Sequence, residues 1–267
     1  MPSAPSHIEV RGVTKVFPAS SGGEVRALGP VDLDLPRGEF FSVVGPSGCG
    51  KSTFLDILAG LSSPTAGTVA FNGKALAGAV PDGVGVVFQQ DASFAWLTVW
   101  DNVAFGLRRQ GKDGTEIRRR VDHALAFMGL SGFAKAYPAQ LSGGMKQKVA
   151  IARALANDPE VILMDEPFAN LDAQTRLLMR EELLRIWERD KKTVILVTHN
   201  LDEAVMLCDR IAVMSSRPGL IKSIVTVDVP RPRTMKSMRD PDFANCMDKI
   251  WNLLKYDVED ALERGRP

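Results

Sequence analysis

The sequence is poor in the features that mark secreted, metal-bound and membrane-spanning chains. Only three of its 267 residues are cysteines, which is too few, at positions too scattered, for a disulfide framework or a cysteine metal site. The N-terminus lacks a basic segment followed by an apolar run, so we expect no signal peptide. No apolar stretch approaches the roughly 18 residues that span a bilayer, so any link to a membrane has to come through another protein.

An excess of charge of one sign is also lacking. The chain has 33 Lys and Arg against 32 Asp and Glu, a formal net charge of +1, so nothing indicates nucleic acid as the main partner. Cys49 lies in a glycine-rich loop where we expect a thiol to be sensitive to oxidation, which favours a reducing cytoplasm. The length and the 45% hydrophobic content are those of an ordinary globular protein with one large α/β domain.

One glycine-rich stretch organises the rest of the chain. It follows the apolar run 40–44, which predicts a buried strand, and it precedes residues 53–58, which predict a helix. A strand, a glycine loop and a helix are the context of a phosphate-binding P-loop, because the N–H groups of the loop and of the helix start point at phosphate oxygens. We expect the nucleotide to be held by Gly45, Pro46, Ser47, Gly48, Cys49, Gly50, Lys51, Ser52 and Thr53.

Polar residues follow the other predicted buried strands, at 84–88, 161–164 and 194–197. Ligands of an open parallel sheet bind beyond the carboxyl ends of its strands, so we expect these residues to converge on the triphosphate. Asp165 is expected to hold Mg²⁺ together with Ser52. Glu166 is expected to act as general base. His199 is expected to bond the γ-phosphate, and Gln89 the metal or the attacking water. A lone histidine or glutamine after a strand is commonly structural, whereas paired carboxylates repel and need a cation.

Residues 141–145 open a further helix that reaches about residue 156. Ser142, Gly143 and Gly144 offer a hydroxyl and two approachable amides at its N-terminus, which is typical of a phosphate site. The alternative is a plain helix cap. Because the chain already has a P-loop, we expect this cap to bind the nucleotide of a second copy, in a two-fold dimer with two shared ATP sites.

The motifs together resemble those of ATP-binding cassette proteins. Residues 45–52 resemble the Walker A motif, Gln89 the Q-loop, 141–145 the signature, 161–166 Walker B, 170–172 the D-loop and His199 the switch histidine. The resemblance implies an α/β P-loop NTPase fold with a mainly parallel core sheet, an N-terminal antiparallel β layer and an inserted α-helical subdomain. The core is expected at 8–90 and 141–216, the helical subdomain at 91–140 and a C-terminal extension at 217–267.

Two further site residues follow from this resemblance. Phe17 is expected to stack on adenine, with a core phenylalanine at a strand end as the alternative. Asp172 of the D-loop is expected to join the nucleotide site. Asn170 departs from the family pattern, which usually has a small residue there, and this puts the packing of the D-loop in doubt.

The resemblance also implies a motor subunit of a membrane transporter, working at the cytoplasmic face of the membrane. ATP closes the dimer and hydrolysis reopens it, which drives the permease subunits. A short permease helix is expected in a groove near Gln89, against apolar residues that are alternatively the subdomain's own core: Phe94, Trp96, Leu97, Val99 and Trp100.

Finer features resemble the nitrate, sulfonate and taurine importers. They include a signature that ends in Met145 and the segment Arg217-Pro218-Gly219. This branch implies a solute-binding protein as an indirect partner. The solute stays open among taurine, another sulfonate, nitrate and a pyrimidine precursor.

Three other classes were weighed. DNA-repair and chromosome ATPases split the cassette with coiled-coil arms, and no sustained heptads separate Lys51 from Leu141. Two-cassette translation factors need a second P-loop, which this chain lacks, and its neutral charge argues against both nucleic-acid roles. A small-molecule P-loop kinase would leave the cap at Ser142 without a purpose.

Overall fold

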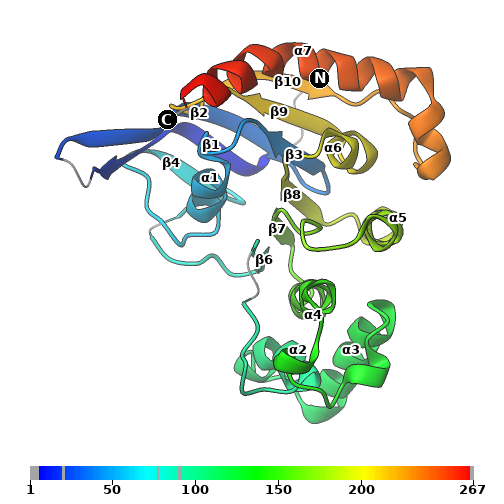
Figure 1. The fold of residues 1–267 in the computed structure, drawn as a ribbon. Coiled ribbons are helices and arrows are strands. Elements are labelled where there is room, and N and C mark those ends of the chain that lie inside the picture. The colour runs from blue at the N-terminus through cyan, green and yellow to red at the C-terminus, as the bar shows by residue number, and fades with distance from the viewer. Residues whose placement is uncertain (1–5, 20–21, 77, 90–91, 265–267) are drawn as a thin grey trace. The chain divides into compact units, whose positions relative to one another are not determined.

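The computed structural model describes residues 6–19, 22–76, 78–89 and 92–264. The chain divides into two compact units, of which unit 1 comprises residues 1–82 and 180–267 and unit 2 comprises residues 83–179 (Figure 1). The expected division into a core, a helical subdomain and an extension stays a prediction. Gln90 and Asp91, where two of those parts would meet, lie outside the described residues. No helix in the described ranges combines the length and the apolar composition that a membrane span requires.

Unit 1 begins with an antiparallel sheet in the order β2-β1-β4-β5. Its strands are β1 (Ser6–Pro18), β2 (Glu24–Pro36), β4 (Ala66–Phe71) and β5 (Lys74–Ala75). The predicted antiparallel layer is confirmed, although β1 and β2 are longer than the sequence indicated. Register shifts between Val10 and Lys15 interrupt their pairing, and the clean apolar alternation is confined to Val31, Leu33 and Leu35, which are all buried.

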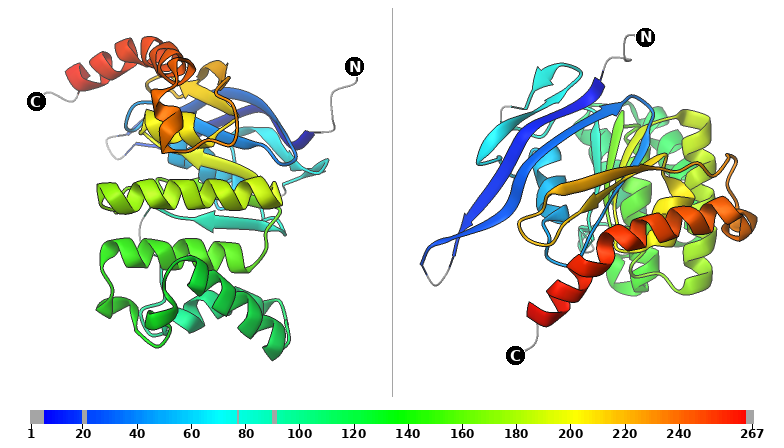
Figure 2. Two further views of the ribbon diagram at one scale, coloured as in Figure 1. Left: turned by 90° about the vertical axis from the view of Figure 1, so that its right-hand side faces the viewer. Right: turned by 90° about the horizontal axis from the view of Figure 1, so that it is seen from above.

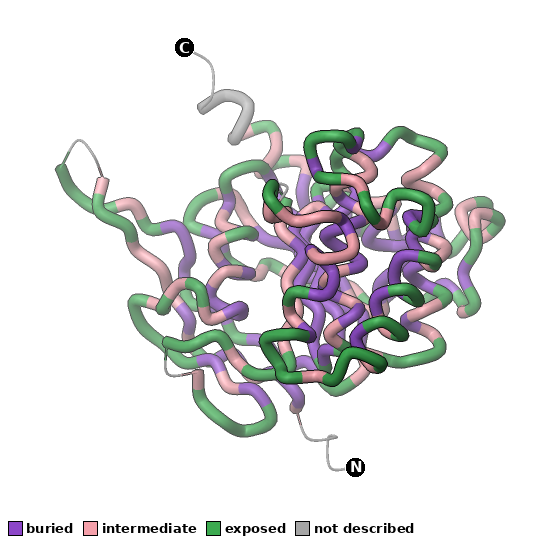
Figure 3. The backbone as a smooth tube through the Cα atoms, turned by 90° about the horizontal axis from the view of Figure 1, so that it is seen from below, coloured by how far each residue is buried: buried purple, intermediate pink, exposed green. Residues whose placement is uncertain are grey.

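A second sheet of unit 1 carries four strands in the order β10-β9-β3-β8. They are β3 (Phe40–Val44), β8 (Thr193–Val197), β9 (Arg210–Met214) and β10 (Ile221–Thr226). β3 pairs in parallel with both β8 and β9, whereas β10 is antiparallel to β9. Every residue of β3 and β8 is buried. Figure 3 draws the buried residues of the chain in purple. The sequence prediction missed β10, because its residues alternate only between intermediate and exposed positions and give no buried stripe.

The helices of unit 1 include α1 (Lys51–Leu58) and α6 (Leu201–Leu207), and the 3-10 helix η3 (Met235–Arg239) precedes α7 (Pro241–Arg264). The predicted terminal helix is therefore confirmed. α7 packs against β9, β10 and α6, and Figure 2 shows it running beside these elements. The C-terminal segment is thus an integral part of unit 1.

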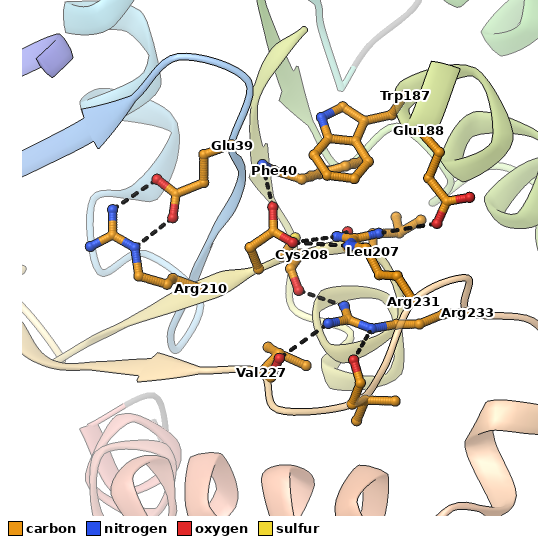
Figure 4. Close-up of polar contacts among 12 residues, drawn as sticks. Glu39, Phe40, Trp187, Glu188, Leu207, Cys208, Arg210, Val227, Arg231 and Arg233 are labelled. Carbon is orange, nitrogen blue, oxygen red and sulfur yellow. Dashed lines mark hydrogen bonds and ion pairs between the residues drawn. The ribbon is translucent and has the colours of Figure 1, made fainter. Parts of the chain in front are cut away.

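Buried Arg233 fastens this C-terminal segment to unit 1 (Figure 4). Its guanidinium donates to four main-chain carbonyls, at distances between 2.6 and 3.1 Å, namely those of Val205, Cys208, Val227 and Val229. Burial lowers the pKa of Arg233 to about 10. The four hydrogen bonds offset the free energy that burying the charge costs, because hydrogen bonds from a charged donor are stronger than those between neutral groups.

Arg231, two residues earlier, makes a second attachment. It donates to the carbonyl of Leu207 and to the carboxylate of Asp209, both at 2.7 Å. Its guanidinium also lies 4.2 Å from the centroid of the Trp187 ring, within the range of a cation–π contact. Trp187 belongs to α5 (Ala173–Asp190), so the extension is tied to a helix as well as to strands.

Unit 2 contains two parallel strands, β6 (Val84–Val87) and β7 (Val161–Asp165), and a group of helices. The helices are α2 (Val99–Arg109), α3 (Gly114–Phe127), η1 (Ser131–Phe133), η2 (Pro138–Gln140) and α4 (Gly143–Ala156). α2, α3 and α4 pack on one another. Thr98 is the N-cap of α2, because its hydroxyl accepts from Asp101 N and also donates to the Asp101 carboxylate.

Candidate active site

The glycine-rich loop of residues 45–52 lies between β3 and α1, which confirms the predicted strand, loop and helix. Gly50 is the N-cap of α1 with φ 108, a left-handed conformation that favours glycine, and no side chain caps the helix. The Lys51 ammonium donates to the carbonyls of Gly45 and Pro46, at 2.8 and 2.9 Å. The loop thus holds its own cation next to a helix start, as an anion site requires.

The thiol of Cys49 is buried within this loop. Burial raises the pKa of Cys49, and the nearby Lys51 ammonium only partly opposes that effect. A shielded thiol with a raised pKa is less reactive. The expectation of an oxidation-sensitive cysteine is therefore not supported, and the compartment has to be argued from other observations.

His199 follows β8 at the same sheet edge as the glycine-rich loop. Val43 of β3 lies opposite Val197 of β8 in the parallel ladder, and Thr198 N donates to the carbonyl of Val43 at 3.3 Å. The exposed His199 therefore stands two residues beyond the end of β8, the strand that adjoins the one leading into the loop. Within unit 1, the structure brings this histidine and the loop to one edge.

A buried network that the sequence analysis did not single out fixes the turn on both sides of His199. The Thr198 hydroxyl donates to one carboxylate oxygen of Glu203 at 2.7 Å, and Arg180 donates to the other at 2.5 Å. The N–H of Asn200 donates to the Thr198 hydroxyl at 3.0 Å. The sequence signalled only the helix cap in this network, because Asn200 and Glu203 stand at the N-cap and N3 positions of α6.

In unit 2, the parallel pairing of β6 and β7 brings together two predicted catalytic residues. Val87 lies opposite Met164, and beyond these residues the Gln89 amide donates to the Glu166 carboxylate at 3.1 Å. Glu166 has φ 44, a left-handed conformation that is costly for a residue with a side chain. The turn after β7 therefore holds this carboxylate in a strained backbone geometry.

Asp165 ends β7 and is buried, immediately before Glu166. No group of three or more His, Cys, Asp or Glu suited to a metal ion occurs among the described residues. Mg²⁺ prefers oxygen donors and commonly takes few protein ligands. The hydroxyl of Ser52, the amide oxygen of Gln89 and the carboxylate of Asp165 have the chemistry that this ion requires.

Ser142 is the N-cap of α4, which both interpretations of this segment predict; its binding of phosphate stays a prediction. The Ser142 hydroxyl accepts from Met145 N at 3.3 Å, and both Ser142 and Gly143 are exposed. A Cβ added to Gly144 would lie 3.1 Å from a methyl carbon of Leu171. The cap and the D-loop are therefore neighbours within unit 2.

Asp172 caps the start of α5 by accepting from Thr175 N at 2.9 Å. Hydrogen bonds from Thr175 lower the pKa of Asp172. Asp172 is thus a helix-capping residue in this structure, and its expected share in a nucleotide site stays a prediction. Phe17, near the end of β1, is 39% exposed and has the Lys15 ammonium 5.0 Å from its ring centroid. An exposed ring does not fit the alternative of a core phenylalanine.

The apolar residues expected to receive a permease helix divide into buried and exposed ones. Val99 is fully buried and belongs to the core of unit 2, whereas Trp96 is 75% exposed. Phe105, which the sequence analysis did not name, is 40% exposed. The Phe94 ring lies between these two side chains, 5.5 Å from Trp96 and 4.5 Å from Phe105 by ring centroids. We call Phe94, Trp96 and Phe105 the aromatic patch.

Comparison with known proteins identifies the family of this chain. The family model described as ABC transporter matches residues 28–169, more than half of the chain. The chain belongs to the ABC transporter family. The resemblance inferred from its motifs is therefore confirmed, and the chain is an ATPase of the ABC type.

Several ABC relatives match this chain over nearly its whole length. An uncharacterized ABC transporter ATP-binding protein of Methanocaldococcus jannaschii is 50% identical over 96% of this chain and 94% of its own. A nitrate import ATP-binding protein of Synechocystis sp. is 44% identical over 93% of this chain and 95% of its own. A taurine import ATP-binding protein of Jannaschia sp. is 41% identical over 96% of both chains.

A solved structure supports the ABC fold independently. It is the dimeric post-hydrolysis state of an ATP-binding cassette with ADP and phosphate, which matches with a TM-score of 0.75 and 35% identity. The match covers 82% of this chain and 98% of that one. The predicted fold class, an ABC ATPase with a parallel core sheet, an antiparallel layer and helical elements, is confirmed.

Proposed function

We propose that this ABC ATPase drives the import of a small solute such as nitrate, taurine or another sulfonate. The observation that carries the proposal is the match, over more than nine-tenths of both chains, to relatives named as nitrate and taurine import ATP-binding proteins. Permease subunits would form the path for the solute, and a solute-binding protein would deliver it. The ATPase would then sit at the cytoplasmic face of the membrane, attached through the permease.

The nucleotide is assigned first to unit 1. Backbone N–H groups of Gly45 and of residues 47–53 and the Lys51 ammonium hold the phosphates of ATP. Phe17 stacks on adenine, and the exposure of its ring supports this role. Asp172 lies in unit 2, where it caps α5 and so holds the D-loop beside the cap at Ser142.

Mg²⁺ is assigned to Ser52, Gln89 and Asp165, whose oxygen donors suit it. Held by these residues, the ion would supply positive charge against the charge that develops on the phosphate oxygens. Ser52 lies in the first turn of α1, Asp165 is the last residue of β7, and Gln89 follows β6. All three side chains offer oxygen atoms, which are the ligands that Mg²⁺ prefers.

Hydrolysis is assigned to Glu166 as general base. Its carboxylate accepts a proton from water as the water oxygen bonds to the γ-phosphorus, and the bond from that phosphorus to the bridging oxygen of ADP breaks. The hydrogen bond from Gln89 supports this role, since it orients the carboxylate. His199 donates to an oxygen of the γ-phosphate, and the network around Thr198 and Glu203 holds it in place.

A second copy of the chain completes each nucleotide site in this proposal. Ser142, Gly143 and Gly144 of one copy bind the γ-phosphate held by the other copy. The exposure of Ser142 and Gly143 supports this role, as does the similarity to a dimeric cassette with ADP and phosphate. ATP binding would close the dimer, and loss of phosphate would let it open.

The aromatic patch is the proposed contact with the permease. Trp96 exposes three quarters of its surface beside Phe105, and exposed apolar clusters of this kind mark interaction sites. An apolar face of a short permease helix fits such a surface. Trp96→Ser should leave basal ATPase activity unchanged and should abolish its stimulation by permease in membrane vesicles.

Uptake by cells that lack this chain tests the function. The panel is labelled nitrate, taurine, a second sulfonate and a pyrimidine precursor. We expect uptake of one of them to be lost, to return with the wild-type chain and not to return with Glu166→Gln. Unchanged uptake of all four solutes would contradict the assignment to this importer branch.

A further inference from the structure

The link between β9 and β10, residues 215–220, packs directly against the glycine-rich loop. We call this link the strap. The guanidinium of Arg217 donates to the carbonyl of Gly48 at 3.1 Å. Two residues on, Gly219 N donates to the carbonyl of Ala27 at 3.0 Å, and a Cβ at Gly219 would collide with the carbonyl oxygen of Cys49. The strap therefore contacts two consecutive residues of the glycine-rich loop, Gly48 and Cys49.

The Arg217 bond bears on the orientation of a loop amide. The carbonyl of Gly48 and the N–H of Cys49 belong to one planar trans peptide, in which they point in opposite directions. Arg217 holds the carbonyl end, and the N–H end points back to the carbonyl of Pro46 at 3.3 Å. The Cys49 N–H is thus bonded within the loop, and fixing this peptide holds the backbone path from which the neighbouring N–H groups of a P-loop bind phosphate.

The strap is in turn held by the C-terminal helix. Asp257 of α7 accepts from Ser216 N at 2.9 Å with one oxygen and from the Lys222 ammonium at 2.5 Å with the other. Lys222 also donates to the carbonyl of Leu253 at 2.9 Å. The side chain of Asp257 is only 13% exposed. One carboxylate of α7 therefore fixes the residue that precedes Arg217.

We propose that Arg217 is a positioning residue for nucleotide binding and that α7 acts on the glycine-rich loop through Asp257 and the strap. Through these contacts the C-terminal extension supports nucleotide binding by the glycine-rich loop. The inference rests on the proposed role of residues 45–53 in holding ATP. Arg217 is not assigned to the reaction itself, so its loss affects the binding of nucleotide and not the chemical step.

The first test measures the dissociation constant for labelled ATP with Mg²⁺ by equilibrium dialysis, together with the KM and kcat of hydrolysis. Arg217→Ala should raise Kd and KM about three- to tenfold, the effect of one lost hydrogen bond, with kcat within about twofold. Arg217→Lys should recover part of the loss, because lysine keeps a donor. Arg239→Ala, at an exposed arginine of the same extension, is the matched control and should match wild type.

Each result of this test has one meaning. An unchanged Kd in Arg217→Ala, or a fall in kcat at constant KM, would overturn the positioning role. Lys51→Ala distinguishes a failure of the strap proposal from a failure of the proposed phosphate loop. If it loses ATP binding while Arg217→Ala does not, only the strap proposal fails. If Lys51→Ala binds ATP like wild type, the proposed phosphate loop itself is wrong.

The second test addresses the role of α7. Asp257→Asn should raise Kd in the same direction as Arg217→Ala, whereas Asp248→Asn, at an exposed position of the same helix, should not. If both residues act through the strap, the double variant should be no worse than the more severe single one. Fully multiplicative effects, or an Asp257→Asn variant that binds ATP normally, would overturn the connection to α7.

Discussion

The Gln89 amide donates a 3.1 Å hydrogen bond to the Glu166 carboxylate, just beyond the ends of two neighbouring parallel strands. The backbone of Glu166 has a left-handed conformation with φ 44, which is unfavourable for a residue with a side chain. The hydrogen bond from Gln89 restricts the rotation of the Glu166 carboxylate. Strain together with an orienting donor at a strand end is the combination expected of a working base.

Glu166→Gln should therefore bind ATP and hardly hydrolyse it. The amide keeps the size of the side chain and removes its basicity, so we expect steady-state turnover to fall by about two to four orders of magnitude. Release of phosphate and equilibrium binding of ATP are the two measurements. Glu182→Gln, which changes a carboxylate of α5 that is 30% exposed and paired with Arg185, serves as control. Near-normal turnover in Glu166→Gln would refute the assigned base.

The sequence predicted those parts of the fold and the site in which local signals agree. The strands that precede Gln89 and Glu166 could be found because continuous apolar runs stop abruptly at polar residues. The expectation that both are buried holds for β7, whereas only Val87 of β6 is buried. β10 could not be found, since its half-exposed residues resemble a loop. Arg180 and Glu203 went unnoticed because a buried ion pair joins distant segments, and a single sequence carries no sign of that pairing. Arg217 was noted as part of a motif, but its contact with Gly48 depends on tertiary packing.

Breaking the buried pair of Arg180 and Glu203 should be strongly destabilising. Both side chains are 5% exposed, and removing one partner of such a pair commonly costs about 3–5 kcal/mol. We expect Glu203→Ala to lower the free energy of unfolding in urea by about that amount. Replacing both partners, in Arg180→Met with Glu203→Leu, should cost much less. A single variant as stable as wild type would show that the pair does not hold the His199 turn.

Arg233 should matter for stability far more than other arginines of the extension. Arg233→Ala leaves four carbonyls without their donor, which we expect to cost about 3 kcal/mol in urea unfolding. Arg239→Ala, at an exposed position, should change the free energy of unfolding by less than about 0.5 kcal/mol. Equal effects of the two substitutions would contradict the anchoring role of Arg233.

The strap should loosen in acid. Burial raises the pKa of the Asp257 carboxyl, but the bonds from Lys222 and Ser216 N lower it more, so it lies below its ordinary value of 3.8. A carboxyl with a lowered folded-state pKa contributes stability that is present above pH 3.8 and is lost as the pH falls through the folded-state value. Urea unfolding should therefore show wild type more stable than Asp257→Asn at pH 6, with the difference shrinking below pH 3.8. A difference that is constant with pH would contradict this account of Asp257.

The central claim is that two copies of this chain share their ATP sites through the cap at Ser142, and the molar mass of Glu166→Gln in solution tests it most directly. Light scattering with and without ATP and Mg²⁺ gives that mass. The account predicts a shift from monomer to dimer on adding ATP, abolished by Ser142→Arg, which places a bulky cation on the exposed cap. A nucleotide-saturated Glu166→Gln protein that stays monomeric, or a dimer indifferent to Ser142→Arg, would contradict it.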